Sequence, residues 1–261
     1  MRKPMAPSDA PLVGAYNYRL VALSVLIAIL ASYAALDLGG RVAAARGGIR
    51  WFWLAGGSVT MGFGIWAMHY IGMLAWTLPV AVLYDWPTVL VSLLAGILAS
   101  GVALFVVSRP EMGRRGVQVG TVVFGLGIAS MHYIGMAAMR LPAMCRYSPG
   151  IVVLSIALAV AISMVALRLI FDCREDEVTG RRKLASSVLM GAAIPAMHYT
   201  GMAAVTFVPM AMGESLTHSV AISSLGVVAI SSVTLIVLGL GILTSMINRR
   251  FVSQALRRVT M

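Results

Sequence analysis

Residues 64–73 read GIWAMHYIGM, and the same pattern returns as GIASMHYIGM at residues 127–136 and as AIPAMHYTGM at residues 193–202. His69, His132 and His198 hold the same place in the three copies and account for three of the chain's four histidines. A proline follows each histidine by ten, ten and eleven residues, at Pro79, Pro142 and Pro209. A repeat of this length does not arise from composition alone, so the three copies are the strongest indication of how the chain is organised.

The composition is typical of a membrane protein. Of the 261 residues, 60% are hydrophobic and 11% are charged, and the mean hydropathy is +0.92. Crossing about 30 Å of hydrocarbon takes about 20 helical residues, and backbone groups cannot stay unpaired in lipid. We therefore predict an all-α polytopic membrane protein with seven transmembrane helices, at residues 18–38, 53–78, 88–107, 117–141, 151–171, 184–208 and 219–247.

A second, shorter repeat marks the odd-numbered segments. Ser32, Ser100, Ser163 and, more weakly, Ser231 lie in similar Ser/Ala-rich surroundings, spaced by 68, 63 and 68 residues. The pattern predicts three A-B helix pairs followed by a final A helix, with the histidine motif on every B helix. Small residues in such a stripe usually serve close helix packing. The first segment shares this pattern, which favours a retained helix over a cleaved signal peptide.

The basic residues predict the orientation. Fifteen of the 20 lysines and arginines fall on one side of the predicted helices, among them Lys183 in the loop region before the sixth helix. Positive charge gathers in cytoplasmic loops, so the N-terminus is expected outside and the C-terminus inside. The net charge of +11 then reflects topology and not nucleic-acid binding. The predicted organisation is an extracytoplasmic tail at 1–17, a membrane domain at 18–247 and a basic cytoplasmic tail at 248–261.

The repeated motif offers a set of metal ligands. Each histidine is expected about nine residues from the outer end of its helix, roughly 13 Å deep, so the three imidazoles should lie at one level. Residues four apart share a helix face, which puts the second methionine of each copy beside its histidine. Gly64, Met68 and Gly72, with their equivalents in the other copies, lie on an adjacent line, where small residues would let a neighbouring helix approach closely. Imidazole nitrogen and thioether sulfur without carboxylate favour copper, especially Cu(I). The candidate metal ligands are His69, His132, His198, Met73, Met136, Met202, Met68, Met131 and Met197.

Other interpretations of the motif stay open. The histidines could form a Tyr–His hydrogen-bond network with a structural or proton-relay role, and the methionines could be core residues, because Met fills gaps well. Tyr70, Tyr133 and Tyr199 point about 100° away from their histidines, which favours packing or support over ligation. A copper transporter would use the same donors, but it should carry further ligands at cytoplasmic depth. A haem b protein with histidine axial ligands is the other rival.

The three Met-His-Tyr copies, the last continuing to Thr200, closely resemble the MHYT domain of bacterial integral-membrane signalling proteins. The first two copies carry Ile71 and Ile134 where that threonine would stand. The resemblance covers the seven predicted helices and implies an inner-membrane sensor in which the motif Met and His residues bind copper near the outer face. It also implies a response to oxygen, carbon monoxide or nitric oxide. Better-known members often continue into an enzymatic output domain. Only three residues follow Arg258, so we expect no catalytic activity in this chain and a separate signalling partner.

Overall fold

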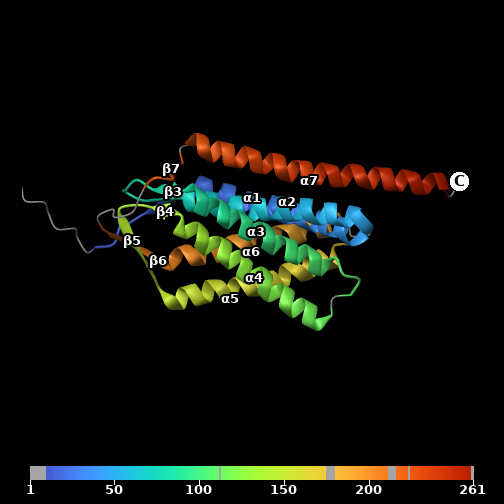
Figure 1. Cartoon of the computed structure of the whole chain (residues 1–261), viewed down its shortest axis with the longest axis horizontal. Helices are drawn as coiled ribbons and strands as arrows, with labels where there is room; N and C mark the ends of the chain where they lie inside the picture. The colour runs from blue at the N-terminus through green and yellow to red at the C-terminus, as the bar shows by residue number, and fades with distance from the viewer. Residues whose placement is uncertain (1–9, 112, 175–179, 211–215, 223, 260–261) are drawn as a thin grey trace, which may run out of the picture.

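The computed structural model describes residues 10–111, 113–174, 180–210, 216–222 and 224–259. Within these residues it is a bundle of seven long helices with seven short strands at one end (Figure 1). The helices are α1 (Tyr18–Ala44), α2 (Gly47–Leu74), α3 (Trp86–Val107), α4 (Arg114–Ala137), α5 (Pro149–Asp172), α6 (Gly180–Ala203) and α7 (Ser224–Val259). Of the predicted N-terminal tail, residues 1–9 lie outside the described residues.

Five of the helices are long and apolar enough to cross a membrane: α1, α3, α4, α5 and, within α7, Gly226–Thr244. The sequence predicted seven such spans. The other two helices, α2 and α6, carry the first and third histidine motifs. Their histidine, tyrosine, serine and glycine residues lower the hydropathy, and residues of this kind are tolerated in a membrane where they face other helices. The apolar helices show that the chain is a multi-pass membrane protein.

Helices α1 to α6 form a closed ring. Each packs against the next in sequence, and α6 returns to pack on α1. At three places in the ring, two helix backbones come into close contact at a glycine that lies seven residues before a motif histidine. A Cβ atom added at these glycines would overlap the backbone of the next odd-numbered helix, which is a contact that only glycine allows. The three pairs follow one cyclic order: Gly62 with Ile97, Gly125 with Val160 and Gly191 with Ile29.

The strands form a thin layer over the end of the bundle at which the histidine motifs end, here called the strand end (Figure 1). The strand that leaves each even-numbered helix pairs antiparallel with the strand that leads into the preceding odd-numbered helix. Asn17, Asp85 and Ser148 each donate a backbone N–H, at 2.8 Å, to the carbonyl of the residue just after the partner helix. The strands are β1 (Ala15–Tyr16), β2 (Trp76–Thr77), β3 (Leu83–Asp85), β4 (Met139–Arg140), β5 (Ala143–Tyr147), β6 (Val205–Pro209) and β7 (Ser219–Ala221).

The strands correct the predicted helix ends. Helices α2, α4 and α6 end at Leu74, Ala137 and Ala203, four or five residues earlier than predicted. The residues beyond are mostly apolar, so hydropathy alone extends the helix through them. Each histidine consequently lies five residues before the end of its helix, at a depth of about 7–8 Å below that end and not 13 Å. The three depths are equal, as predicted.

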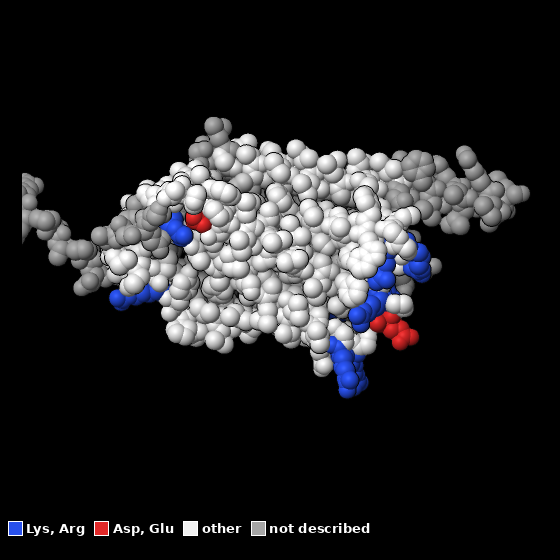
Figure 2. Space-filling model, in the orientation of Figure 1, with Lys and Arg blue, Asp and Glu red and all other residues white. Residues whose placement is uncertain are grey.

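The opposite end, here called the basic end, carries the α1–α2 and α3–α4 connections. Figure 2 shows Lys and Arg at the two ends of the bundle, separated by a middle without charged side chains on this face. One predicted loop charge is placed differently. Lys183 lies in the first turn of α6, buried, where its ammonium pairs with the Asp37 carboxylate of α1 and stands 4.7 Å from the centre of the Tyr33 ring. A lysine in lipid needs such a partner, which explains why this one is not at the surface.

The odd-numbered helices converge toward the basic end. Leu36, Leu104 and Leu167, which follow the Ser repeat at equal distances, are at most 1% exposed and belong to the main core. Gly39 lets α1 approach Ile170 of α5, since a Cβ there would overlap that side chain. The Gly39-Gly40 pair therefore serves packing and does not end α1, which runs six residues past its predicted end.

Helix α7 stands outside the ring and packs on α1 and α2. Leu238 is buried against α2, 3.3 Å from the Cβ position of Gly64, five residues before His69. The helix continues without a break through residues 248–259, the segment that the sequence predicted as a tail, and Figure 1 shows it running on past the α1–α2 turn. A single rigid element thus connects the neighbourhood of the first histidine motif with the far side of the basic end.

Candidate metal centre

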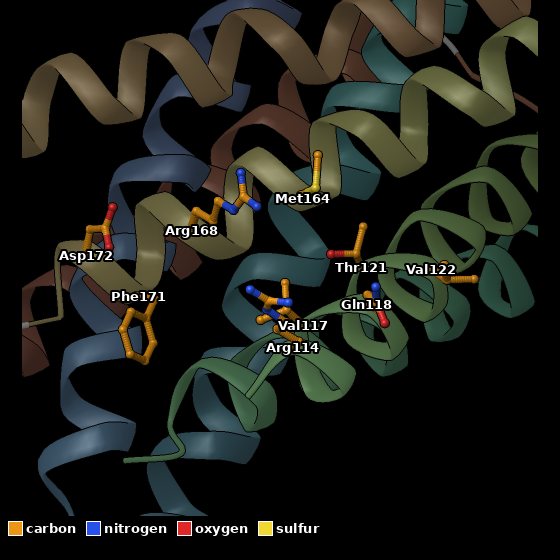
Figure 3. Close-up of a pocket in the computed structure, with 9 residues that line it drawn as sticks. All are labelled: Arg114, Val117, Gln118, Thr121, Val122, Met164, Arg168, Phe171 and Asp172. Atoms are coloured by element: carbon orange, nitrogen blue, oxygen red, sulfur yellow. The ribbon is translucent and has the colours of Figure 1, made fainter. Parts of the chain in front are cut away.

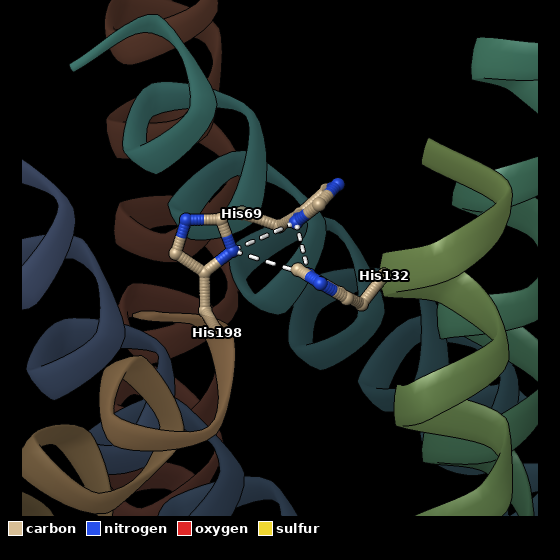
Figure 4. A group of neighbouring side chains, drawn as sticks. All are labelled: His69, His132 and His198. Atoms are coloured by element: carbon tan, nitrogen blue, oxygen red, sulfur yellow. Dashed lines mark hydrogen bonds between the residues drawn. The ribbon is translucent and has the colours of Figure 1, made fainter. Parts of the chain in front are cut away.

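The three motif histidines meet at the axis of the ring. Nδ1 of His69 lies 3.0 Å from Nδ1 of His198 and 3.2 Å from Nδ1 of His132, and the third side of this triangle is 3.3 Å. Figure 4 shows the imidazoles coming from three separate helices and turning one ring nitrogen each toward a common centre. All three side chains are buried, with at most 1% exposed. The predicted convergence of the histidines is therefore confirmed.

These three contacts cannot all be hydrogen bonds. A neutral imidazole nitrogen is either a donor or an acceptor, never both. Among three nitrogens in mutual contact, two must have the same role, so at least one contact brings two donors or two acceptors together. Burying such a mismatch is costly. A cation at the centre removes it, because all three lone pairs can then point at the same ion.

The size of the triangle fits a metal ion. Its centre lies about 1.8 Å from each Nδ1 atom, so an ion slightly out of the plane would reach the roughly 2.0 Å typical of a metal–imidazole bond. Within the described part of the chain, this trio is the one group of three His, Cys, Asp or Glu side chains whose donor atoms gather closely enough, within 4.8 Å, to hold a metal ion. The donor set is neutral and nitrogen-rich, which suits copper or zinc better than calcium or magnesium.

A glycine on the neighbouring helix fixes the back of each imidazole. The Nε2 atom of His69 faces Gly135, that of His132 faces Gly201 and that of His198 faces Gly72, and a Cβ at any of these glycines would overlap the ring. These are the glycines three residues after each histidine in the motif. The ring edge opposite Nδ1 is thus pressed against the backbone, which aims Nδ1 at the centre. The three Nε2 atoms are buried and make no hydrogen bond.

The six motif methionines lie close in sequence to the three histidines, but their contacts do not show whether any of them is a ligand. All are buried, at 1–5% exposure. Met131 packs outward onto α3, where its Cγ lies 3.4 Å from the Cβ position of Gly96. This contact matches the line of residues that was expected to face a neighbouring helix. Gly64 and Gly127, on that line, likewise meet Ala31 and Ala99 of the preceding odd-numbered helices. Ligation by Met68, Met73, Met131, Met136, Met197 and Met202 stays a prediction.

The motif tyrosines support the site from outside. Tyr133 shares a 2.6 Å hydrogen bond with Ser155 of α5, and Tyr199 shares one of 2.9 Å with Ser24 of α1. At the equivalent place on α3, Ser92 accepts a hydrogen bond of 3.1 Å from the indole N–H of Trp66. Ser24, Ser92 and Ser155 are all fully buried. The expectation that the tyrosines pack and support, and do not ligate, agrees with these contacts.

A second set of tyrosines closes the strand end, and the sequence reasoning missed it. Tyr16, Tyr84 and Tyr147 precede the odd-numbered helices, and each ring meets a motif tyrosine at 5.6–6.1 Å between ring centres. Their spacings of 68 and 63 residues equal those of the Ser repeat, which is the signal that could have revealed them. Burial raises the pKa of Tyr147 to about 12, with Cys145 and Tyr133 adding to the effect. Tyr147 therefore stays a neutral hydroxyl at physiological pH.

Toward the basic end the site is followed by apolar side chains. Leu36, Leu104 and Leu167 belong to this part of the core. The thiol of the buried Cys173 donates a hydrogen bond to the Ser186 hydroxyl at 3.7 Å. His218, the fourth histidine, lies in the strand-end loops beside Trp86, 6.0 Å between ring centres, and takes no part in the trio. The trio is therefore a buried site near the strand end of the bundle.

The chain matches a known family through its three motifs. Residues 62–120, 125–179 and 191–256 match the MHYT family, described as a bacterial signalling protein N-terminal repeat. The matched segments start just before each histidine motif and cover most of the chain, so the repeat that defines the family includes the three histidines of the candidate metal centre. No solved structure matches the fold.

Curated relatives agree with this match. The chain is 44% identical over 201 residues to the bifunctional diguanylate cyclase/cyclic di-GMP phosphodiesterase MucR of Pseudomonas aeruginosa. It is 42% identical over 195 residues to signaling protein YkoW of Bacillus subtilis and 41% identical over 192 residues to cyclic di-GMP phosphodiesterase NbdA of Pseudomonas aeruginosa. These alignments cover 72–75% of the chain but only 24–29% of the relatives, so the activities in those names belong to much longer proteins. The chain is a member of the MHYT family of bacterial membrane signalling domains.

Proposed function

We propose that this protein is a copper-binding sensor module of a bacterial cytoplasmic membrane. The observation that carries the proposal is the triangle of Nδ1 atoms, because its dimensions suit one metal ion and because its contacts cannot all be satisfied without a cation. His69, His132 and His198 would hold the ion. The motif methionines are proposed to supply soft donors near it, which would favour Cu(I) over harder ions.

We further propose that all seven helices span the bilayer as three pairs and a final helix, with the strand end outside. The uncharged middle of the bundle and the equivalent contacts of the three pairs support this arrangement. The basic end would then face the cytoplasm, in keeping with the positive-inside rule. In this orientation the metal centre lies shallow in the outer half of the membrane, within reach of small molecules from the external side.

A copper ion held by three imidazoles would supply an open position for a diatomic gas such as oxygen, carbon monoxide or nitric oxide. The chain's own contribution is to hold the three rings rigidly and to connect them to α7. A shift of α2 at His69 would be felt at Leu238, which packs beside Gly64. Because α7 runs on to Val259, such a shift would reach the cytoplasmic side, where a signalling partner would respond. The relatives' names make cyclic di-GMP turnover the signal to test first.

Two other functions are less well supported. A copper transporter needs further ligands along its path, whereas Leu36, Leu104 and Leu167 follow the site toward the basic end and the Cys173 thiol lies beside the Ser186 hydroxyl. A haem b site with two axial histidines would hold their nitrogens about 4 Å apart, which is twice a metal–nitrogen bond. The observed separations of 3.0–3.3 Å are shorter and leave no room for a porphyrin between the rings.

Metal analysis of the protein purified from membranes tests the proposal. The expected result is about one copper per chain after loading with Cu(I), no Soret band, and loss of the copper in a His69→Ala, His132→Ala, His198→Ala triple variant. Copper retained by the triple variant, or a Soret band in the wild-type protein, would overturn it.

A further inference from the structure

A groove on the outside of the bundle, at the basic end, is unrelated to the metal centre. It lies between α4 and α5, with a volume of about 720 Å³, and Figure 3 shows the residues of both helices that line it. Arg114 and Asp172 stand at the helix ends, Arg168 one turn deeper, and Val122 and Met164 deeper still. The groove is therefore charged at its mouth and apolar along its length toward the bilayer interior.

The two arginines of this groove have no interaction partner among the described residues. Among the described residues, Arg114 and Arg168 make no hydrogen bond or ion pair. A second basic groove at the same end, lined by Arg46, Arg50 and Arg174, differs in this respect. Arg46 donates to carbonyls at the end of α1, Arg50 donates to Ser108, and Arg174 donates to the carbonyls of Val107, Arg109 and Pro110. The α4–α5 groove thus keeps two guanidinium groups available for a ligand.

One of the residues that line the groove, Thr121, also carries a buried polar atom without a partner. Thr121 is 6% exposed, and its hydroxyl has no hydrogen-bond partner. Other helical Ser and Thr residues in this chain, such as Ser58, Thr60 and Thr200, donate to the carbonyl four residues earlier. A buried hydroxyl without a partner costs free energy. Thr121 lines the groove from α4 (Figure 3), so a ligand oxygen that reached its hydroxyl would supply the missing partner.

We propose that this groove binds one anionic phospholipid of the surrounding bilayer. The phosphodiester would lie between Arg114 and Arg168, an ester or glycerol oxygen would accept from Thr121, and an acyl chain would follow Val122 and Met164. Basic pockets between transmembrane helices commonly take lipid headgroups in this way. Asp172 reduces the net charge of the groove to +1, which matches a phosphodiester with one negative charge and disfavours a phosphate dianion. A headgroup with hydroxyls, such as glycerol, could donate to Asp172.

Binding of short-chain lipid to the detergent-purified full chain tests the site. Dioctanoyl phosphatidylglycerol should bind, and dioctanoyl phosphatidylcholine and inorganic phosphate should bind at least about tenfold more weakly. An Arg114→Gln, Arg168→Gln variant should lose about tenfold or more in affinity. An Arg46→Gln, Arg50→Gln variant removes the same charge at the same end and should stay within about twofold.

Two further variants keep the test independent of folding. Arg114→Lys, Arg168→Lys should keep most of the affinity, and Thr121→Val, which preserves shape, should lower it by a few fold. The Tm and the gel-filtration profile of each variant report whether the bundle is intact. Equal binding of the two lipids, displacement by inorganic phosphate alone, or equal losses in the two Gln variants would overturn the proposal.

Discussion

The Nδ1 atoms of His69 and His198 lie 3.0 Å apart, although 129 residues separate them in the sequence. His132 completes the triangle, and each ring is held from behind by a glycine of a neighbouring helix. Three imidazoles from three repeats thus converge on one point, which is an arrangement that a single ion can satisfy and that hydrogen bonding alone cannot.

Single histidine variants should each disable the site. Replacing His132 by alanine removes one of three ligands, and we expect copper affinity to fall by at least about 100-fold. Substitutions of residues that only orient a metal ligand already cost up to about 100-fold. Competition with a calibrated Cu(I) chelator measures this loss. The matched control is His218→Ala, because His218 lies beside Trp86 and outside the trio. An equal loss in both variants would contradict the assignment.

The glycines that contact the imidazole rings should be needed for the site, because a larger residue would overlap the ring. A methyl group at Gly135 would overlap Nε2 of His69, so Gly135→Ala should displace that ring and cost about 1–3 kcal/mol, seen as weaker copper binding or a lower Tm. Gly56→Ala is the control, since a Cβ there meets nothing within 4 Å. If Gly135→Ala bound copper as tightly as this control, the close packing would be unnecessary for the site.

The methionines should tune the metal preference and not create the site. A Met73→Leu, Met136→Leu, Met202→Leu variant keeps nearly the same volume and should remain folded. We expect it to retain a metal ion on the three histidines but to lose about tenfold in its preference for Cu(I) over Zn(II), because thioethers favour soft ions. Parallel titrations with the two metals give this ratio. Complete loss of metal binding would show that the thioethers are essential ligands.

The buried ion pair at the basic end should stabilise the packing of α1 and α6. Lys183→Met leaves the buried Asp37 carboxylate without its ammonium partner, at a cost of about 3 kcal/mol. The Lys183→Met, Asp37→Asn double variant should lose less than the two single variants combined, by about 1–3 kcal/mol. Denaturation in detergent measures these differences. Arg115→Met, at an exposed arginine of α4, is the control, and additive losses would contradict the pairing.

The start of α3 should respond to pH. Asp85 caps this helix by accepting hydrogen bonds from the hydroxyl and the backbone N–H of Thr88, and these bonds hold the pKa of Asp85 below its usual value. A lowered pKa in the folded state means that the stabilisation is present above the ordinary pKa of aspartate and is lost as the pH falls through the lowered one. Asp85→Ala should therefore lower the Tm at pH 7 and have little effect in strong acid. A pH-independent difference would contradict this cap.

Much of the site could be predicted from the sequence because it is repeated. Equal positions in three similar helices must lie at equal depth, and the structure brings the three histidines together. The glycine line of the motif also predicted close helix contacts, which Gly64 and Gly127 make with Ala31 and Ala99. What no pattern showed is which ring nitrogen faces the centre, since that depends on the glycines of a neighbouring helix.

The ends of the elements were harder to predict, for physical reasons. The strands after α2, α4 and α6 are mostly apolar, so their hydropathy resembles that of a continuing helix, and pairing with a distant strand distinguishes them. The first helix was predicted to end at residue 38, just before Gly39, which in the structure serves the close approach of α1 to α5. Lys183 looked like a loop charge because its partner, Asp37, is 146 residues away.

X-ray absorption at the copper edge of the Cu(I)-loaded protein tests the central claim most directly. Three Nδ1 donors at one ion predict imidazole scattering from about three nitrogens near 2.0 Å, with any sulfur as an additional contribution. The same spectrum should lose its imidazole signature in the His69→Ala, His132→Ala, His198→Ala variant. A copper environment without imidazole nitrogen in the wild-type protein would contradict the account.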